Sequence, residues 1–512
     1  MSARFNMPDK SNIQGFILKG YGHNYSCHLL LTFPKNNETS IKAFIGDLYP
    51  KVQSADPWKE KPESLLNIGL TYNGIKKIGT AAVAPTDLEN FPISFKEGPW
   101  MGGSQASLGD VYPLNGKTSP SHPKYWWNAN AESGSTNENN TNLDCIIHAY
   151  GITAEALETL VTDIMNSAAK HKLTEIIPLE NGKRLYQTEV ENDPHKIHFG
   201  YTDGISQPAL QNPGTSSFRT TPEDINSFLV GYYTGAVSMP GPVDSSSSGT
   251  FAKDGTYNAF RVLYQDVASF NKLLKNQADK HAGLVEKLNL KDKAELEEWF
   301  AAKLCGRWRN GSPMITNPEH QSANIEGAIH DEDFGYTVLD NLPPRSVAKL
   351  TDAVPSSKSC PFSSHTRVTN TRNQQLKASE GEISSPRIIR RGVPYGKPLE
   401  VGSTNEDMED RGLIGLFFCG SLTLQFEKIS GWMNNNNFSD SPIFSIENPP
   451  QDALLGNRAI ESYSGVVDTF DIPLESGETI TIENLPPLLI TRGTAYCFLP
   501  SMKSLANIAG ME

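Results

Sequence analysis

Three short segments of this chain carry the residue types that could do chemistry together. The first, CPFSSHTRVTNTR (360–372), has one histidine and two arginines and no acid. A neutral imidazole nitrogen is a good metal ligand, and a guanidinium group pairs bidentately with carboxylates. No second histidine or CxxC pair lies near His365, so these residues alone also fit an ordinary surface or core histidine.

The other two segments supply an acid and a cation. In HFGYTDGISQPAL (198–210), Gly200 and Gly204 bracket Asp203, which indicates tight backbone geometry but equally fits a plain Asp-Gly turn. In SPRIIRRGVPYG (385–396), an apolar pair precedes Arg390 and Arg391. This pattern predicts a strand that delivers a cation at its end, and a strand with a solvated tip is the alternative.

Length and composition limit the class of protein. The chain has 512 residues, a formal net charge of −13 and a pI near 5.4, which argues against a general nucleic-acid binder. The sequence has no run of 18 apolar residues, so we expect no membrane span, and the first residues lack the pattern of a secretory signal. The six scattered cysteines are typical of reduced thiols, so we expect a cytoplasmic protein.

Strand and helix patterns alternate along both halves of the chain. Apolar runs at 27–33, 65–72 and 143–151 predict strands, and 153–170 predicts a helix with Thr153 as its N-cap. The second half repeats the rhythm, with strands at 258–266, 413–422 and 493–500 and helices at 267–276 and 424–433. This order favours an α+β protein with antiparallel sheets. We place the boundary between two domains, 1–215 and 216–512, after the polar segment QNPGTSSF.

Taken in order, these segments resemble those of the dye-decolourising peroxidases, which bind haem b. GYTDG is similar to that family's glycine-x-x-aspartate-glycine signature, and SSHTRVTNTR to its histidine segment, with Thr371 where proline is usual. RIIRRGVPYG resembles the segment that supplies its distal arginine. NIQGFIL, CGRWRNGSP and RGLIGLFFCGSLTLQFEKI extend the similarity over nearly the whole chain.

The resemblance implies a fold of two ferredoxin-like domains with one haem b per chain, held mainly by the C-terminal domain. It implies that His365 is the proximal ligand of the haem iron, that Asp203 is the distal acid–base and that Arg390 is the distal arginine. The remaining residues implied in haem binding are Arg367 and Arg372 toward the propionates, Gly204, Ile205 and Ser206 along one edge, and Asn370 and Thr371 on the other side. We prefer Arg390 to Arg391 because it directly follows the apolar pair and alternate strand residues face opposite sides.

Some positions are left open. A carboxylate is expected behind His365, because a ligating histidine usually donates its other ring nitrogen to one. Asp452 and Glu427 are both candidates. Gly415 stands where many members of the family carry a bulky aromatic residue, which predicts a wider peroxide pocket.

The function implied is reduction of hydrogen peroxide with oxidation of dyes, phenols or similar small aromatic donors. Trp308 is a candidate for relaying electrons at the surface, although a packed and silent tryptophan fits as well. The main alternative is a haem carrier, sensor or iron-recovery protein on the same scaffold, although such a protein would need neither Asp203 nor Arg390. We expect no nucleic-acid or membrane partner and leave a homo-oligomer open.

Overall fold

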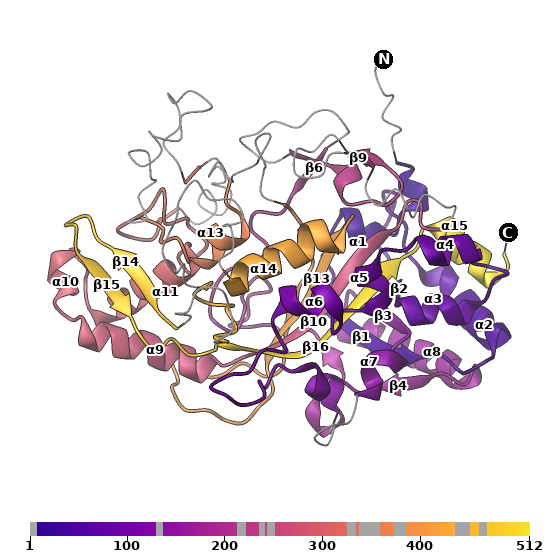
Figure 1. The fold of residues 1–512 in the computed structure, drawn as a ribbon, viewed down its shortest axis with the longest axis horizontal. Helices are drawn as coiled ribbons and strands as arrows, with labels where there is room; N and C mark the ends of the chain where they lie inside the picture. Colours follow the sequence, from indigo (N-terminus) through magenta and orange to yellow (C-terminus); the bar gives the residue numbers. More distant parts are fainter. Residues whose placement is uncertain are drawn as a thin grey trace, which may run out of the picture.

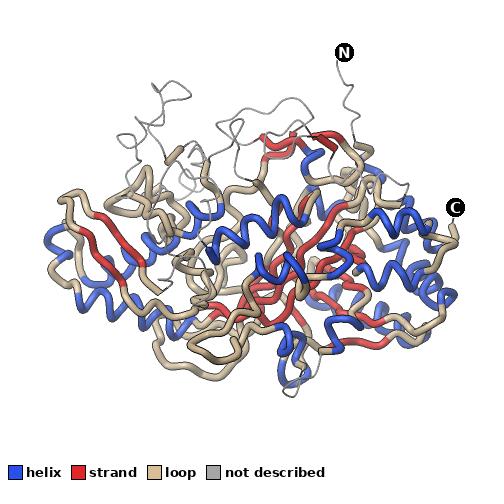
Figure 2. The backbone as a smooth tube through the Cα atoms, viewed as in Figure 1, coloured by secondary structure: helices blue, strands red, loops and turns tan. Residues whose placement is uncertain are grey.

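A computed structural model describes residues 8–129, 137–211, 222–234, 241–242, 251–324, 334–336, 359–372, 386–435, 451–459 and 468–511. Figure 1 shows the chain path and Figure 2 its strands, which gather in the middle of the molecule with helices around them. Within the described part of the chain, no helix combines the length and the apolar character needed to cross a membrane.

The N-terminal half forms one βαββαβ unit. Its elements are β1 (Tyr25–Thr32), α2 (Glu38–Leu48), β2 (Ser64–Leu70), β3 (Cys145–Gly151), α8 (Ala154–Lys170) and β4 (Thr174–Ile176). The strands lie in the order β2-β3-β1-β4, and every pair is antiparallel. This order defines a ferredoxin-like unit.

The C-terminal half repeats this arrangement. Its elements are β10 (Thr256–Gln265), α9 (Val267–Lys280), α11 (Lys293–Cys305), β11 (Ile389–Arg390), β12 (Val393–Tyr395), β13 (Gly412–Cys419), α14 (Glu427–Asn435) and β16 (Leu489–Leu499). β13 lies between β10 and the short strands β11 and β12, and β16 lies on the other side of β10, again all antiparallel. The predicted α+β fold of two ferredoxin-like units is therefore confirmed.

The two units share one sheet. β16 pairs with β2 through Phe498 and Leu70, which joins both halves in a single ten-stranded sheet. The hydrophobic core follows this connection, because side chains from both halves, including Leu66 and Tyr496, pack in the same cluster. The predicted boundary near residue 215 lies outside the described residues and stays a prediction.

Smaller elements cover the sheet and flank the site. They are α1 (Gly15–Leu18), α3 (Tyr72–Ile78), α4 (Pro85–Asn90), α5 (Ile93–Glu97), α6 (Gly102–Leu108), α7 (Glu138–Asn142), β5 (Leu185–Tyr186), β6 (Ala209–Gln211), β7 (Pro222–Asp224), β8 (Tyr233–Thr234), β9 (Gly241–Pro242), α10 (Leu284–Lys287), α13 (His365–Thr369), β14 (Phe470–Pro473), β15 (Thr479–Ile482) and α15 (Met502–Ala509). Figure 1 shows the hairpin β14–β15 beside α10 and α11, at the end of the molecule opposite α2 and α3.

Local sequence signals explain the clearest elements. Thr153 caps α8 as predicted, because its side chain accepts a hydrogen bond from the Ala156 N–H at 3.1 Å. The residues of α8 that recur at helical spacing, among them Leu157 and Leu160, are buried against the sheet. The predicted helix at 424–433 differs in its first turn, which is a π-helical segment (Leu422–Phe426) that continues into α14.

Candidate active site

His365 begins α13 and faces a buried carboxylate. Its Nδ1 lies 2.8 Å from Oδ2 of Asp452, whose side chain is 0% exposed, whereas the His365 side chain is 24% exposed. An ionised carboxylate can only accept, so Nδ1 carries the proton and Nε2 keeps its lone pair. Among the described residues, none makes a hydrogen bond with Nε2. The imidazole is therefore oriented as a ligating histidine should be.

Asp452 is itself held in place by backbone groups. Its Oδ1 accepts hydrogen bonds from the N–H groups of Leu454 and Leu455 at 2.8 and 2.9 Å. The buried guanidinium of Arg458 donates to the backbone carbonyls of Asp452 and Ala453, and burial lowers the pKa of Arg458 to about 10. A charged group therefore lies close to Asp452, which offsets part of the cost of burying a carboxylate.

The other candidate for this carboxylate, Glu427, lies elsewhere. It begins α14, is buried, and accepts hydrogen bonds from the hydroxyls of Ser104 at 2.5 Å and Tyr496 at 2.9 Å. Of the two candidates, the structure thus places Asp452 behind His365.

Asp203 and Arg390 contact each other. Arg390 Nη1 lies 3.3 Å from Asp203 Oδ1, and the two side chains are 32% and 37% exposed. Arg390 also donates to the carbonyl of Ile205, and its backbone N–H donates to the side chain of Gln207 at 3.1 Å. These contacts fix the end of β11 against the loop that carries Asp203.

The neighbouring arginine faces the opposite side of β11. Arg391 Nε donates to the carbonyl of Phe16 at 3.3 Å, and burial lowers the pKa of this guanidinium to about 10. Its surroundings include the aromatic rings of Tyr21 and Tyr150. The structure therefore brings Arg390, and not Arg391, together with Asp203.

Ser206 connects the three segments that the sequence singled out. Its hydroxyl accepts hydrogen bonds from Arg307 at 3.2 Å and from Arg372 at 3.3 Å, and its carbonyl accepts one from Arg387 at 3.0 Å. Ser206 has a φ of +59°, in the left-handed region, which non-glycine residues occupy mainly where the surroundings enforce it. Three arginines therefore converge on Ser206, three residues after Asp203. Sequence reasoning missed Arg307 and Arg387, although both lie in quoted motifs.

The remaining predicted haem-binding residues are placed differently from one another. Ile205 and Thr371 are buried, and Asn370 accepts a hydrogen bond from the Arg372 N–H at 3.3 Å. A Cβ built on Gly204 would meet no atom within 4 Å, so the backbone there borders open space. Arg367 is fully buried, and its guanidinium donates to the Cys360 carbonyl at 2.6 Å instead of joining the cations at Ser206. Its predicted contact with a propionate stays a prediction.

Two further expectations concern aromatic residues. Trp308 is 1% exposed and donates to the Asn317 carbonyl at 2.8 Å, which matches the packed alternative. The space that Gly415 leaves is occupied, because a Cβ there would lie 2.5 Å from the Phe417 ring. Phe417 pairs with Arg390 in the sheet and stacks on Phe426. An aromatic ring thus lies beside Arg390 despite Gly415.

These residues fit an iron porphyrin. His365 offers one nitrogen ligand, and the structure shows no group of three or more His, Cys, Asp or Glu side chains that could hold an ion among its described residues. A porphyrin brings its own four nitrogens and two propionates, and the arginines at Ser206 suit carboxylates. Opposite charges at Asp203 and Arg390 provide a proton acceptor and a fixed cation.

Comparison with known proteins gives the same class. No family model matches the chain. The chain is 25% identical over 519 residues to "Peroxidase 2" of Mycetinis scorodonius, and the match covers 97% of this chain and 87% of that protein. The chain is 27% identical over 374 residues to a "Dye-decolorizing peroxidase" of Mycena epipterygia, and the match covers 70% of this chain and 64% of that protein.

Solved structures share the fold along the whole chain. A fungal DyP-type peroxidase from Auricularia auricula-judae superposes with a TM-score of 0.73 at 20% identity, covering 99% of both chains. A dye-decolorizing peroxidase in complex with 2,6-dimethoxyphenol gives 0.70 at 22% identity, covering 98% of this chain and 100% of that one. This chain is thus similar to dye-decolourising peroxidases over nearly its whole length and shares the fold of their solved structures.

Proposed function

We propose that this chain is a haem-dependent peroxidase that reduces hydrogen peroxide and oxidises dyes, phenols or similar one-electron donors. The observation that carries the proposal is the 3.3 Å contact between Asp203 and Arg390, joined through Ser206 to the histidine segment. A protein that only carries haem needs neither group, whereas a peroxidase needs both.

On the proximal side, the chain holds one imidazole ready for iron. Haem b, one per chain, would supply the iron to which peroxide binds and the electrons that break its O–O bond. His365 would hold that iron through Nε2, while Asp452 keeps the proton on Nδ1 and makes the ring a stronger donor. Arg307, Arg372 and Arg387 would hold the propionates.

On the distal side, Asp203 and Arg390 would divide the work on peroxide. Asp203 would take the proton from the near oxygen and return it to the far oxygen, which leaves as water. Arg390 would stabilise the negative charge that develops as the O–O bond lengthens. Over a full cycle, one peroxide, two protons and two electrons from two donor molecules give two waters.

The choice of an aspartate sets the expected pH range. Aspartic acids ordinarily titrate near pH 3.9, and histidines near 6.5. A peroxidase that uses an aspartate base keeps that base charged in acid where a histidine base would be lost. Because each cycle also consumes two protons, we propose that turnover with dyes is best in acid and weak at neutral pH.

The donors proposed for this chain follow from its relatives. One solved relative carries 2,6-dimethoxyphenol, a small electron-rich phenol, and several curated relatives are called dye-decolorizing peroxidases. Phenols and dyes of this kind are the donors that we propose here. The cytoplasmic location and a homo-oligomeric state stay predictions.

An absorption spectrum tests the proposal directly. The purified, haem-loaded protein should show a Soret band that changes within seconds after one equivalent of hydrogen peroxide and returns when 2,6-dimethoxyphenol is added. The variant His365→Ala should lose stable haem binding, seen as a lower haem-to-protein ratio. A protein that keeps haem but shows no spectral response to peroxide would be a haem-handling protein instead.

A further inference from the structure

A cavity of about 670 Å³ is lined in part by the loop that carries Asp203. Its wall includes His198, Phe199 and Gly200 of that loop, Val267 and Asn271 of α9, and the segment 397–407. Volumes of 300–1,000 Å³ are typical of sites for small organic ligands. The cavity is thus large enough for a planar aromatic molecule, and nothing described above for the peroxide site uses it.

One part of the wall is apolar and rigid. Phe199 is buried and packs against Phe270 with ring centroids 4.5 Å apart, and Val267 is buried in the same cluster. Leu399 packs against this cluster from the segment that forms the other side of the cavity. A flat aromatic ligand could therefore bury one face here.

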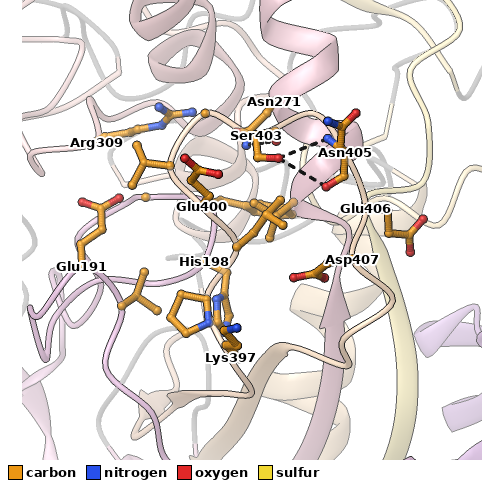
Figure 3. A pocket seen from close by; sticks show the side chains of 18 residues that line it. Glu191, His198, Asn271, Arg309, Lys397, Glu400, Ser403, Asn405, Glu406 and Asp407 are labelled. Atoms are coloured by element: carbon orange, nitrogen blue, oxygen red, sulfur yellow. Dashed lines mark hydrogen bonds between the residues drawn. The ribbon is translucent and has the colours of Figure 1, made fainter.

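The charges around the cavity are mainly negative. Figure 3 shows the carboxylates of Glu191, Glu400 and Glu406 spread around it, with Lys397 as their counterpart below. Glu406 accepts a hydrogen bond from the Tyr264 hydroxyl at 3.2 Å, and the other two charged groups also have protein partners. Arg309 is paired with Glu298 at 2.5 Å, and Asp407 accepts two hydrogen bonds from Arg411. The balance favours a cationic ligand.

A buried hydrogen-bond acceptor in the wall favours a ligand that carries an N–H group. His198 is 7% exposed, and its Nε2 lies 2.8 Å from the Tyr395 carbonyl, so Nε2 carries the proton. Nδ1 is then an acceptor, and it has no hydrogen-bond partner among the described residues. Burial lowers the pKa of His198 to about 4, so the ring stays neutral above that pH. Because Nδ1 itself has almost no exposed surface, a ligand N–H group would supply the missing donor when the ring turns toward the cavity.

The position of the cavity connects it to the proposed chemistry. Gly200 lines the cavity and is three residues before Asp203, so their Cα atoms lie within about 11 Å of one another. We propose that this cavity binds a cationic, nitrogen-bearing aromatic reductant, which gives one electron at a time to the peroxidase. The inference rests on the proposed function for the electron transfer, but not for the binding.

Binding to the resting holoenzyme tests the cavity without turnover. Methylene blue, a planar cationic dye, serves as the probe in equilibrium dialysis at low ionic strength, with anthraquinone-2-sulfonate as the anionic comparison. Glu400→Lys should raise the Kd for methylene blue about tenfold, because it reverses a charge at the cavity. The same variant should leave the Kd for the anionic dye unchanged or should lower it. The double variant Glu191→Gln/Glu400→Gln should weaken the binding of methylene blue by a similar factor.

The matched control is Glu60→Lys, which makes the same charge change at an exposed residue outside the cavity lining. Unchanged affinity in the cavity variants, or an equal loss in Glu60→Lys, would overturn the inference. An equal loss of affinity for both dyes in the cavity variants would also overturn it. Failure of the peroxidase proposal is a separate result, because it would appear as an absent response to peroxide with dye binding intact. If the cavity binds the dye and the protein is a peroxidase, the KM for a cationic donor should rise about tenfold in Glu400→Lys, while the rate of the peroxide reaction should not change.

Discussion

Arg390 and Arg391 are adjacent in sequence but have opposite surroundings. Arg390 contacts Asp203, and Arg391 contacts the Phe16 carbonyl on the other side of β11. We expect Arg390→Leu to keep haem and to slow the reaction with peroxide by roughly two to three orders of magnitude, the usual effect of losing one preorganised electrostatic donor. Stopped-flow absorption at the Soret band measures this rate.

Arg391→Leu is the matched control for that experiment. It removes a buried guanidinium from the Phe16 carbonyl, so it should lower the melting temperature while leaving the peroxide rate within a few-fold of the wild type. The reverse order of the two rates would show that Arg391 is the arginine that acts on peroxide.

Asp452 gives a second prediction at this scale. Asp452→Asn keeps the shape of the group behind His365 but removes its charge, so Nδ1–H donates to a weaker acceptor. We expect retained haem, a more positive reduction potential of the iron, and a peroxide rate lower by about 10- to 100-fold. Redox titration followed by absorption measures the potential. Glu427→Gln should leave that potential unchanged, because Glu427 pairs with Ser104 and Tyr496.

At the scale of elements, sequence patterns were informative where the signal is local. Helix α8 follows from its cap and its apolar spacing, and the alternation of β11 correctly separates Arg390 from Arg391. The contact between His365 and Asp452 joins residues 87 apart in sequence, and no local pattern encodes it. The convergence of Arg307, Arg372 and Arg387 on Ser206 has the same origin, since three separate segments must first fold.

The loop that carries Asp203 depends on one lysine. Lys196 Nζ donates to the carbonyls of Gly200 at 2.7 Å and Arg309 at 3.1 Å, and Thr202 donates to the same Arg309 carbonyl. Gly200 has a φ of +84°, and a Cβ there would lie 3.1 Å from the Arg309 side chain, so glycine fits this tight approach. Lys196 therefore joins the Asp203 loop to the turn that follows α11.

We expect Lys196→Met to loosen this loop and misplace Asp203. The rate with peroxide should fall about tenfold, because a small displacement of a catalytic group is costly. Lys196→Arg should recover part of the rate, since it keeps a charged donor. If Lys196→Met only lowers the melting temperature, with the peroxide rate and its pH profile unchanged, Lys196 supports the fold and does not position Asp203.

At the scale of the whole molecule, the single sheet lies beyond what sequence patterns predict. The alternation of strands and helices favours antiparallel sheets, and the family resemblance implies two ferredoxin-like units, but the pairing of Phe498 with Leu70 depends on how the finished units meet. Sharing one sheet and a core cluster also means that the units should unfold together.

A buried histidine pair in the N-terminal unit should limit the acid range of the whole protein. His28 on β1 and His148 on β3 are cross-strand partners, fully or almost fully buried, and their Nδ1 atoms lie 2.9 Å apart. Burial lowers the pKa of His28 to about 3 and that of His148 well below its usual value. Both rings are therefore neutral in the folded protein at the pH where an unfolded histidine, near 6.5, begins to take up a proton.

The sign of the pH effect follows from these pKa values. Because the unfolded chain binds more protons below about pH 6.5, stability is fully present above that pH and is lost as pH falls toward the folded-state pKa, by up to about 1.4 kcal/mol per unit for each histidine. The peroxide reaction is expected to favour acid, so activity and folding should oppose each other there.

Thermal melts from pH 7 to 4.5 should show a falling melting temperature, and His28→Leu/His148→Leu should flatten that slope, whatever its effect at pH 7. His320→Asn, which changes a more exposed histidine, should leave the slope as it is. An equally steep slope in the double variant would assign the acid sensitivity to other groups, and the pH range of turnover would then be independent of this pair.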